Sequence, residues 1–72
     1  MKNNRFAHNR LEIAQISQRE QVDISVAMAM LAKEKGWKDY GEESLAFKRF
    51  VHNIPAEKRA AYFAGEDVES ED

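Results

Sequence analysis

The stretch that decides the fold is SQREQVDISVAMAMLAKEKG, which runs from Ser17 to Gly36. It has no Gly or Pro before its last residue, and its second half is dominated by Ala, Leu, Met and Lys, which are strong helix formers. Ser17 followed by Glu20 is the pattern of a capping box, in which the serine accepts a backbone N–H and the glutamate reaches back to the serine. Gly36 suits the left-handed conformation that commonly ends a helix. These signals predict a helix over residues 18–35.

The apolar residues of this predicted helix form two adjoining stripes. Between Val22 and Met30 the apolar residues also alternate with the period of a strand, but the intervening alanines are poor strand formers, so we prefer the helix. So wide an apolar surface implies burial on more than one side. One stripe holds Val22, Val26, Ala29 and Met30, and the other holds Ile24, Ala27, Met28 and Leu31.

Two shorter helices are predicted downstream. Glu42 and Glu43 place negative charge where the helix dipole favours it, at the start of a helix over residues 44–53. Pro55 cannot continue that helix and suits the first turn of another, over residues 56–64. The chain is therefore predicted to be all-α, a small three-helix bundle.

The remaining segments are predicted to be a flexible basic arm at 1–10 and a disordered acidic tail at 66–72, on either side of a helical domain at 11–65. Residues 11–17 fit either a helical turn or an extended lead-in. The net charge of the chain is −2, but without the tail 11 basic residues face 8 acidic ones, a net charge of +3. Nucleic-acid binders usually show a stronger basic excess, so charge leaves DNA binding open without favouring it.

Composition argues against several classes of protein. The 72 residues have room for one domain and contain no cysteine, which removes disulfides and thiolate metal sites and fits a reducing cytoplasm. No apolar run approaches the roughly 18 residues that span a bilayer, and the polar start does not resemble a secretion signal. His8 and His52 lack a second ligand at a recognised metal spacing. We expect a cytoplasmic protein that is not an enzyme and holds no metal or cofactor.

A protein partner is the favoured expectation. The connector from Gly36 to Gly41 carries Trp37 and Tyr40, which either fold back as a lid on the core or form an exposed anchor for a partner. Methionine adapts to binding surfaces, so Met28 and Met30 are expected on an interaction or self-association surface as well as in the core, which would permit a homo-oligomer. The predicted partner-binding residues are Val22, Val26, Met28, Met30, Trp37 and Tyr40.

Two alternatives involve nucleic acid. Lys48, Arg49, Lys58 and Arg59 could form a basic patch that, with the basic arm, serves a small helical DNA-binding regulator, or they could simply be solubilising charges. The connector after Gly36 looks too long for the tight turn of a helix-turn-helix. The acidic tail could instead mimic nucleic acid and inhibit a protein that binds it.

Two stretches carry a family resemblance. QVDISVAMAMLAKEK (21–35) resembles the first helix of the theta subunit of bacterial DNA polymerase III and its phage homologue, and PAEKRAAYF (55–63) resembles a later helix of that family. The connector between them is longer than in the family, and the family's C-terminal extension is lacking. The resemblance implies a replication-associated or phage-encoded accessory that binds and stabilises the proofreading exonuclease subunit. Its matched apolar positions are Val22, Ile24, Val26 and Met30.

Overall fold

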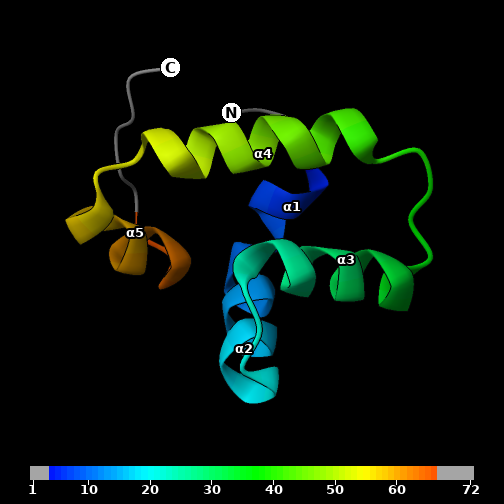
Figure 1. Ribbon diagram of the computed structural model, residues 1–72, viewed down its shortest axis with the longest axis horizontal. Helices are drawn as coiled ribbons and strands as arrows, with labels where there is room; N and C mark the ends of the chain where they lie inside the picture. Colours follow the sequence, from blue (N-terminus) through cyan, green and yellow to red (C-terminus); the bar gives the residue numbers. More distant parts are fainter. Residues whose placement is uncertain (1–3, 67–72) are drawn as a thin grey trace.

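The computed structural model describes residues 4–66, which form an all-α domain. It is flattened, with extents of 30 × 25 × 16 Å. The predicted fold class is confirmed, but the count of three helices is wrong, because two further helices precede the expected first one. The helices are α1 (Arg5–His8), α2 (Arg10–Glu20), α3 (Ile24–Lys35), α4 (Gly41–Asn53) and α5 (Ala56–Phe63) (Figure 1).

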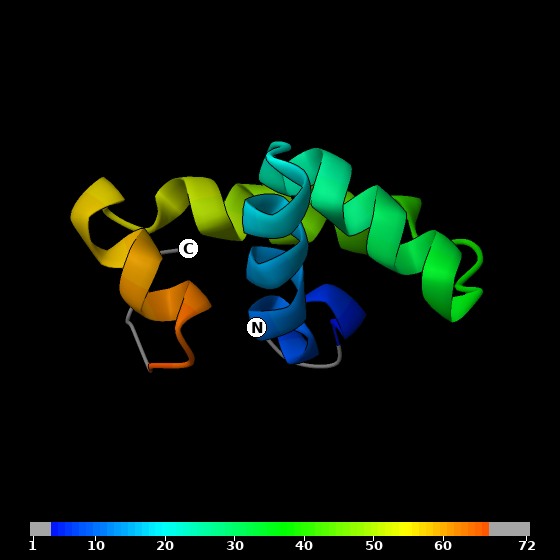
Figure 2. The same cartoon turned by 90° about the horizontal axis from the view of Figure 1, so that it is seen from below.

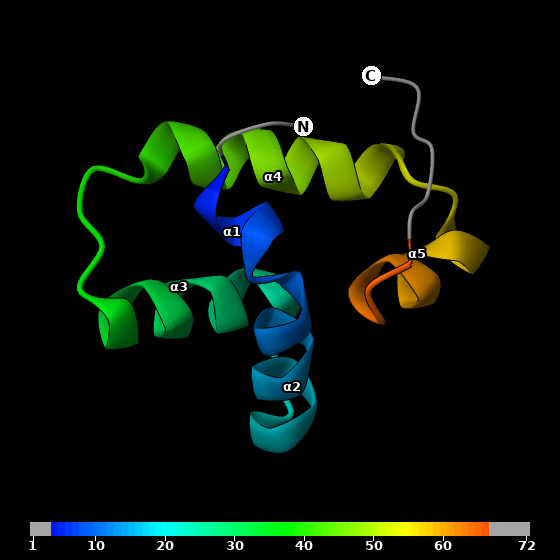
Figure 3. The ribbon, with the colours of Figure 1, turned by 180° about the vertical axis from the view of Figure 1, so that it is seen from behind.

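Helices α3 and α4 run roughly antiparallel, and α2 crosses α3 at a steep angle (Figure 1). Helix α2 packs mainly on α3 and also contacts α5, while α1 contacts both α4 and α2. Seen from below and from behind, α5 lies beyond the C-terminal end of α4, on the side where α3 begins (Figures 2 and 3). The first turn of α3, the second half of α4 and α5 therefore border one region of the molecule.

The predicted helix over 18–35 begins too early. Helix α2 ends at Glu20, Gln21 takes a left-handed conformation with φ of 55°, and α3 starts only at Ile24. Ser17 lies inside α2 instead of capping a helix, and its Oγ donates a hydrogen bond of 2.6 Å to the carbonyl oxygen of Val22. The serine thus holds the turn between the two helices.

The physical reason for the turn is packing. One uninterrupted helix over residues 10–35 would be about 39 Å long, which exceeds the 30 Å length of the whole molecule. Folding back at 21–23 places Ile13 and Ile16 of α2 in the same buried cluster as Leu31 of α3. Burial of those side chains offsets the cost of the left-handed residue.

The predicted flexible arm is wrong for residues 4–10, which are folded into the domain. Phe6 is fully buried, at 0% exposure. Asn4 caps α1, since its Oδ1 accepts the backbone N–H groups of Phe6 at 3.0 Å and Ala7 at 3.3 Å. Its Nδ2 donates to the carbonyl oxygen of Glu43 at 3.0 Å. A four-residue helix is too short to show apolar periodicity, which is why the sequence pattern did not reveal it.

The later helices follow the prediction more closely. Gly36 ends α3 with φ of 71°, and α4 ends at Asn53 as expected. Helix α4 begins at Gly41, three residues early, so Glu42 and Glu43 lie in its first turn. Helix α5 ends at Phe63, one residue short of the prediction. The predicted tail lies outside the described residues except for Glu66, as do the first three residues of the predicted arm.

All five helices contribute to one core. Phe47 of α4 is at its centre, with ring centroids of Phe6 and Tyr62 each 6.2 Å away on different sides. Edge-to-face and tilted rings of this kind stabilise a small core beyond simple area burial. The buried apolar residues are Phe6, Ile13, Ile16, Ala27, Met28, Leu31, Ala32, Phe47, Ile54 and Tyr62.

Candidate partner-binding surfaces

Only one of the two apolar stripes of α3 is deeply buried. Ala27, Met28 and Leu31 belong to the core, and Ile24 packs against it. The other stripe faces outward: Val26 is 44% exposed, Ala29 is exposed, and Met30 is half-buried. The expectation of burial on more than one side holds only in part, because Val22 and Met30 pack against the core while Val26 and Ala29 are exposed. We call Val22, Val26, Ala29 and Met30 the outward stripe.

The two methionines have different environments. Met28 is only 1% exposed and is part of the core, and it also lines a hollow between α3 and α4. Met30 lies on another side of the helix from Met28. Met30 is half-buried and packs against the edge of the core, which leaves part of its thioether chain accessible.

Trp37 and Tyr40 fold back onto the core, as one of the two readings of the connector predicted. The ring of Phe6 contacts both of them edge-on, with centroid distances of 5.3 Å to Trp37 and 5.7 Å to Tyr40. The guanidinium of Arg5 lies 5.2 Å from the centre of the Trp37 ring. Both aromatic side chains are half-buried, so their main contacts are internal.

An ion pair holds α1 against the start of α4. The Nε of Arg5 donates to both carboxylate oxygens of Glu43 at 3.1 Å, and the backbone N–H of Arg5 donates to Oε2 at 3.0 Å. These hydrogen bonds, first from the side chain and then from the backbone of Arg5, lower the pKa of Glu43. Arg5 is therefore a structural residue and not a free charge of a basic arm.

Arg10 also has a structural contact. Its guanidinium carbon lies 4.5 Å from the centre of the Tyr62 ring, and its Nη2 donates to the carbonyl oxygen of Glu66 at 3.3 Å. Burial of the Tyr62 hydroxyl raises its pKa, and the nearby charge of Arg10 opposes that shift. Both described arginines of the predicted arm thus bind to the domain itself.

Three of the four residues of the predicted basic patch, Lys48, Arg49 and Arg59, line two hollows that share Lys48, whereas Lys58 lines neither of them. Arg59 is half-buried, and its Nε donates to the carbonyl oxygens of Val51 at 3.0 Å and Ile54 at 3.1 Å. It caps the C-terminal end of α4, whose last carbonyls lack partners within the helix. Lys48 and Arg49 are exposed on α4, and Lys58 is exposed on α5.

Where α3, α4 and α5 meet, residues of the predicted basic patch lie beside apolar residues that the sequence analysis had not joined to them. A hollow of about 210 Å³ is lined by apolar side chains from α3 and α4 and by Lys48, His52 and Arg59. A neighbouring hollow shares Lys48 and His52 and adds Arg49. We call this surface the cationic groove, with its apolar floor at Ile24, Met28 and Val51 and its charged rim at Lys48, Arg49 and His52.

The apolar floor of the cationic groove could not be predicted from the sequence, because the lining residues come from positions 24 to 59 along the chain. The basic residues of the rim were predicted as a patch, and the spacing of Lys48 and His52 places both on one side of α4. A third hollow also touches Ile24 and is lined mostly by small or apolar residues of α2 and α5, among them Ala14, Ala60 and Phe63.

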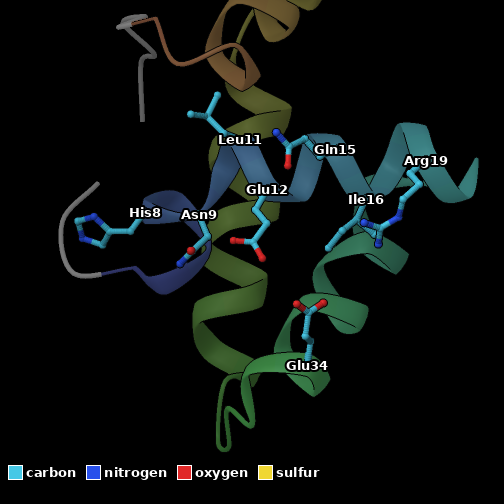
Figure 4. Close-up of a pocket in the computed structure, with 8 residues that line it drawn as sticks. All are labelled: His8, Asn9, Leu11, Glu12, Gln15, Ile16, Arg19 and Glu34. Carbon is cyan, nitrogen blue, oxygen red and sulfur yellow. The ribbon is translucent and has the colours of Figure 1, made fainter.

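The remaining hollow near α2 is polar. Figure 4 shows Glu12 of α2 and Glu34 of α3 directed into it, with His8 pointing away from both carboxylates. The Nζ of Lys35 lies 3.6 Å from Glu12, and Arg19 pairs with Glu20 at 3.0 Å. These side chains are well exposed to solvent, so the hollow is a hydrated surface of mixed charge.

Within residues 4–66, no three His, Cys, Asp or Glu side chains are placed to hold a metal ion together. None of the helices in that range has the length and apolar character needed to cross a membrane. Comparisons with protein-family models, with curated proteins and with solved structures found no match to this chain.

Proposed function

We propose that this protein is a non-enzymatic accessory that binds another protein through the outward stripe of α3. The observation that carries the proposal is the exposure of Val26, at 44%, in the middle of a helix whose other side forms the core. Apolar side chains gathered on one exposed helix face are typical of partner-binding sites. Val22, in the turn before α3, and Met30, within α3, are half-buried and border Val26 on either side along the chain.

The resemblance to the theta subunit includes three residues of the outward stripe. Of its four matched apolar positions, Val26 is exposed, and Val22 and Met30 are half-buried beside it, whereas Ile24 belongs to the inward stripe. A proofreading exonuclease subunit, the partner that the resemblance implies, is therefore one defined candidate for a direct binding test.

The DNA-binding alternative has lost much of its basic surface. Arg5, Arg10 and Arg59 are each engaged in contacts within the domain. Of the described residues of the predicted patch and arm, Lys48, Arg49 and Lys58 remain, and tight duplex binding usually requires more phosphate contacts than these three supply. The nucleic-acid mimic rests on the acidic tail, of which the described residues include only Glu66.

The test compares two apolar-to-charged substitutions on exposed positions. Val26→Glu should abolish capture of the partner from cell lysate, whereas Leu45→Glu should retain it, because Leu45 is also exposed, at 52% against 44% for Val26, but lies on α4. Capture would be followed by mass spectrometry, with circular dichroism to confirm that both variants are folded. Equal capture by the original chain and both variants, or by none of them, would contradict the proposal.

A further inference from the structure

The cationic groove combines two kinds of surface that a single ligand would have to match. Its floor is apolar: Met28 is buried, and Ile24 and Val51 are half-buried. Its rim carries Lys48 and Arg49, both exposed and both on α4, with His52 one turn further along. Among the described residues, no Asp or Glu lines either of the two hollows that form it.

The size of the groove sets the kind of group that it can hold. Pockets for small-molecule ligands are usually enclosed and about 300–1,000 Å³, whereas the two hollows of the groove, of about 210 and 480 Å³, are both open to solvent. The smaller hollow, which has the apolar floor, fits one or two apolar side chains of a protein segment. The rim then lies beside the backbone of that segment, where neighbouring side chains would meet Lys48 and Arg49.

Charge complementarity identifies those neighbouring side chains as carboxylates. Lys48 and Arg49 have no described salt-bridge partner within 4.0 Å in this protein, unlike Arg5, Arg19 and Lys35. The first turn of α3 borders the same hollow at Ile24 and Ser25, and the dipole of a helix favours negative charge at that end. Arg59 contributes less to binding, because its Nε already donates to two carbonyl oxygens of the chain.

We propose that the cationic groove binds an acidic segment of a partner protein, with an apolar side chain of that segment in the hollow and flanking Asp or Glu carboxylates on Lys48 and Arg49. This goes beyond the proposed function, because it assigns a second surface and the chemistry of its ligand. A phosphate backbone is the weaker match, since it would contact the rim and leave the apolar floor uncovered. The groove and the outward stripe lie on different sides of α3, so one partner or two could occupy them.

The first experiment uses the full chain and a short peptide in which Asp and Glu alternate with Leu and Phe. Titration into isotope-labelled protein, followed by NMR, should shift the amide signals of Ile24, Met28, Val51 and His52. A matched peptide with Lys in place of each acid should not bind. A second matched peptide with Ala in place of Leu and Phe should bind at least about tenfold more weakly, because it buries less apolar surface.

The second experiment tests the rim. Lys48→Glu combined with Arg49→Glu should weaken the binding of the acidic peptide by at least about tenfold. The variant should keep its structure, because both side chains are exposed. The control is Lys33→Glu combined with Lys38→Glu, which reverses two exposed charges elsewhere and should leave the affinity near its original value.

Several outcomes would overturn the inference. One is equal affinity of the acidic peptide for both double variants. Another is equal affinity of the Ala-substituted and original acidic peptides for the protein, which would show that charge attraction alone accounts for binding. If duplex DNA shifted the same amide signals at physiological salt and bound more tightly than the peptide, the groove would be assigned to phosphate. Val26→Glu should leave peptide binding unchanged, so failure of the groove and failure of the outward stripe are distinguishable.

Discussion

Around α1, the ring of Phe6 lies among Trp37, Tyr40 and Phe47, and Asn4 and Arg5 add hydrogen bonds to Glu43 at the start of α4. Around α5, by contrast, Tyr62 and Phe63 anchor the helix on α4, while small side chains face α2. A hollow remains between α2 and α5 because alanine cannot fill the space between two helices as an aromatic ring does. Side-chain size thus decides how closely α1 and α5 pack on their neighbours.

The largest expected effect tests the packing around α1. Phe6→Ala removes a fully buried ring and should reduce the free energy of unfolding by about 3–5 kcal/mol. For a domain of this size such a loss leaves little or no stable fold. Urea unfolding followed by circular dichroism measures it. Leu45→Ala is the control, since Leu45 is 52% exposed, and it should change stability by less than about 1 kcal/mol. Equal effects would mean that α1 is not part of the core.

The next effect tests how α5 is held. Arg59→Met keeps an unbranched apolar stem but removes the guanidinium and its hydrogen bonds to the end of α4, and should cost about 1–2 kcal/mol. Lys58→Met, at the adjacent exposed position, should be nearly neutral. Thermal unfolding of the two variants gives the comparison. A neutral Arg59→Met would show that packing of Tyr62 and Phe63 alone positions α5.

A smaller effect concerns pH and the contact between α1 and α4. The pKa of Glu43 is lowered in the folded protein, chiefly by its hydrogen bonds from Arg5. Its contribution to stability is therefore complete above the carboxyl pKa of the unfolded chain, near 4.5, and is lost as pH falls through the lower pKa of the folded state.

Glu43→Gln should accordingly lower the Tm by a few degrees at neutral pH, and the difference from the original chain should vanish in acid. Thermal unfolding measured from about pH 7 to about pH 3 gives both curves. Glu42→Gln is the control, because Glu42 is exposed in the same first turn without the partner. A constant difference between the curves at every pH would contradict the role of the Glu43 charge.

The smallest expected effect is a gain in the stability of the folded protein. Gln21 has φ of 55° in the turn between α2 and α3, a conformation that glycine adopts more readily. Gln21→Gly should therefore raise stability by roughly 0.5 kcal/mol, the relief of strain being partly offset by entropy in the unfolded chain. Gln18→Gly, within α2, should instead be destabilising by about 1 kcal/mol. A loss at both positions would show that the side chain of Gln21 supports the turn.

The sequence by itself determined the helical class and the ends of the later helices. Gly36 adopts a left-handed backbone without steric cost, and Pro55 has a fixed φ and no N–H. Both properties hold whatever surrounds the residue. The fold of Trp37 and Tyr40 onto the core was one of two readings, and local pattern could not choose between them. The choice depended on Phe6, which is distant in the chain and supplies the ring that both contact.

Only the tertiary structure decided which apolar stripe of α3 is buried, that the helix predicted from residue 18 breaks at 21–23, and that the N-terminal segment belongs to the core. Each depends on contacts between residues far apart in sequence: Glu43 with Arg5, and Leu31 with Ile13 and Ile16 in one cluster. The cationic groove has the same origin, since it brings Ile24 of α3 beside His52 of α4. Local propensity is a property of neighbouring residues, whereas burial is shared among helices, so only the folded chain shows which side chains remain available to a partner.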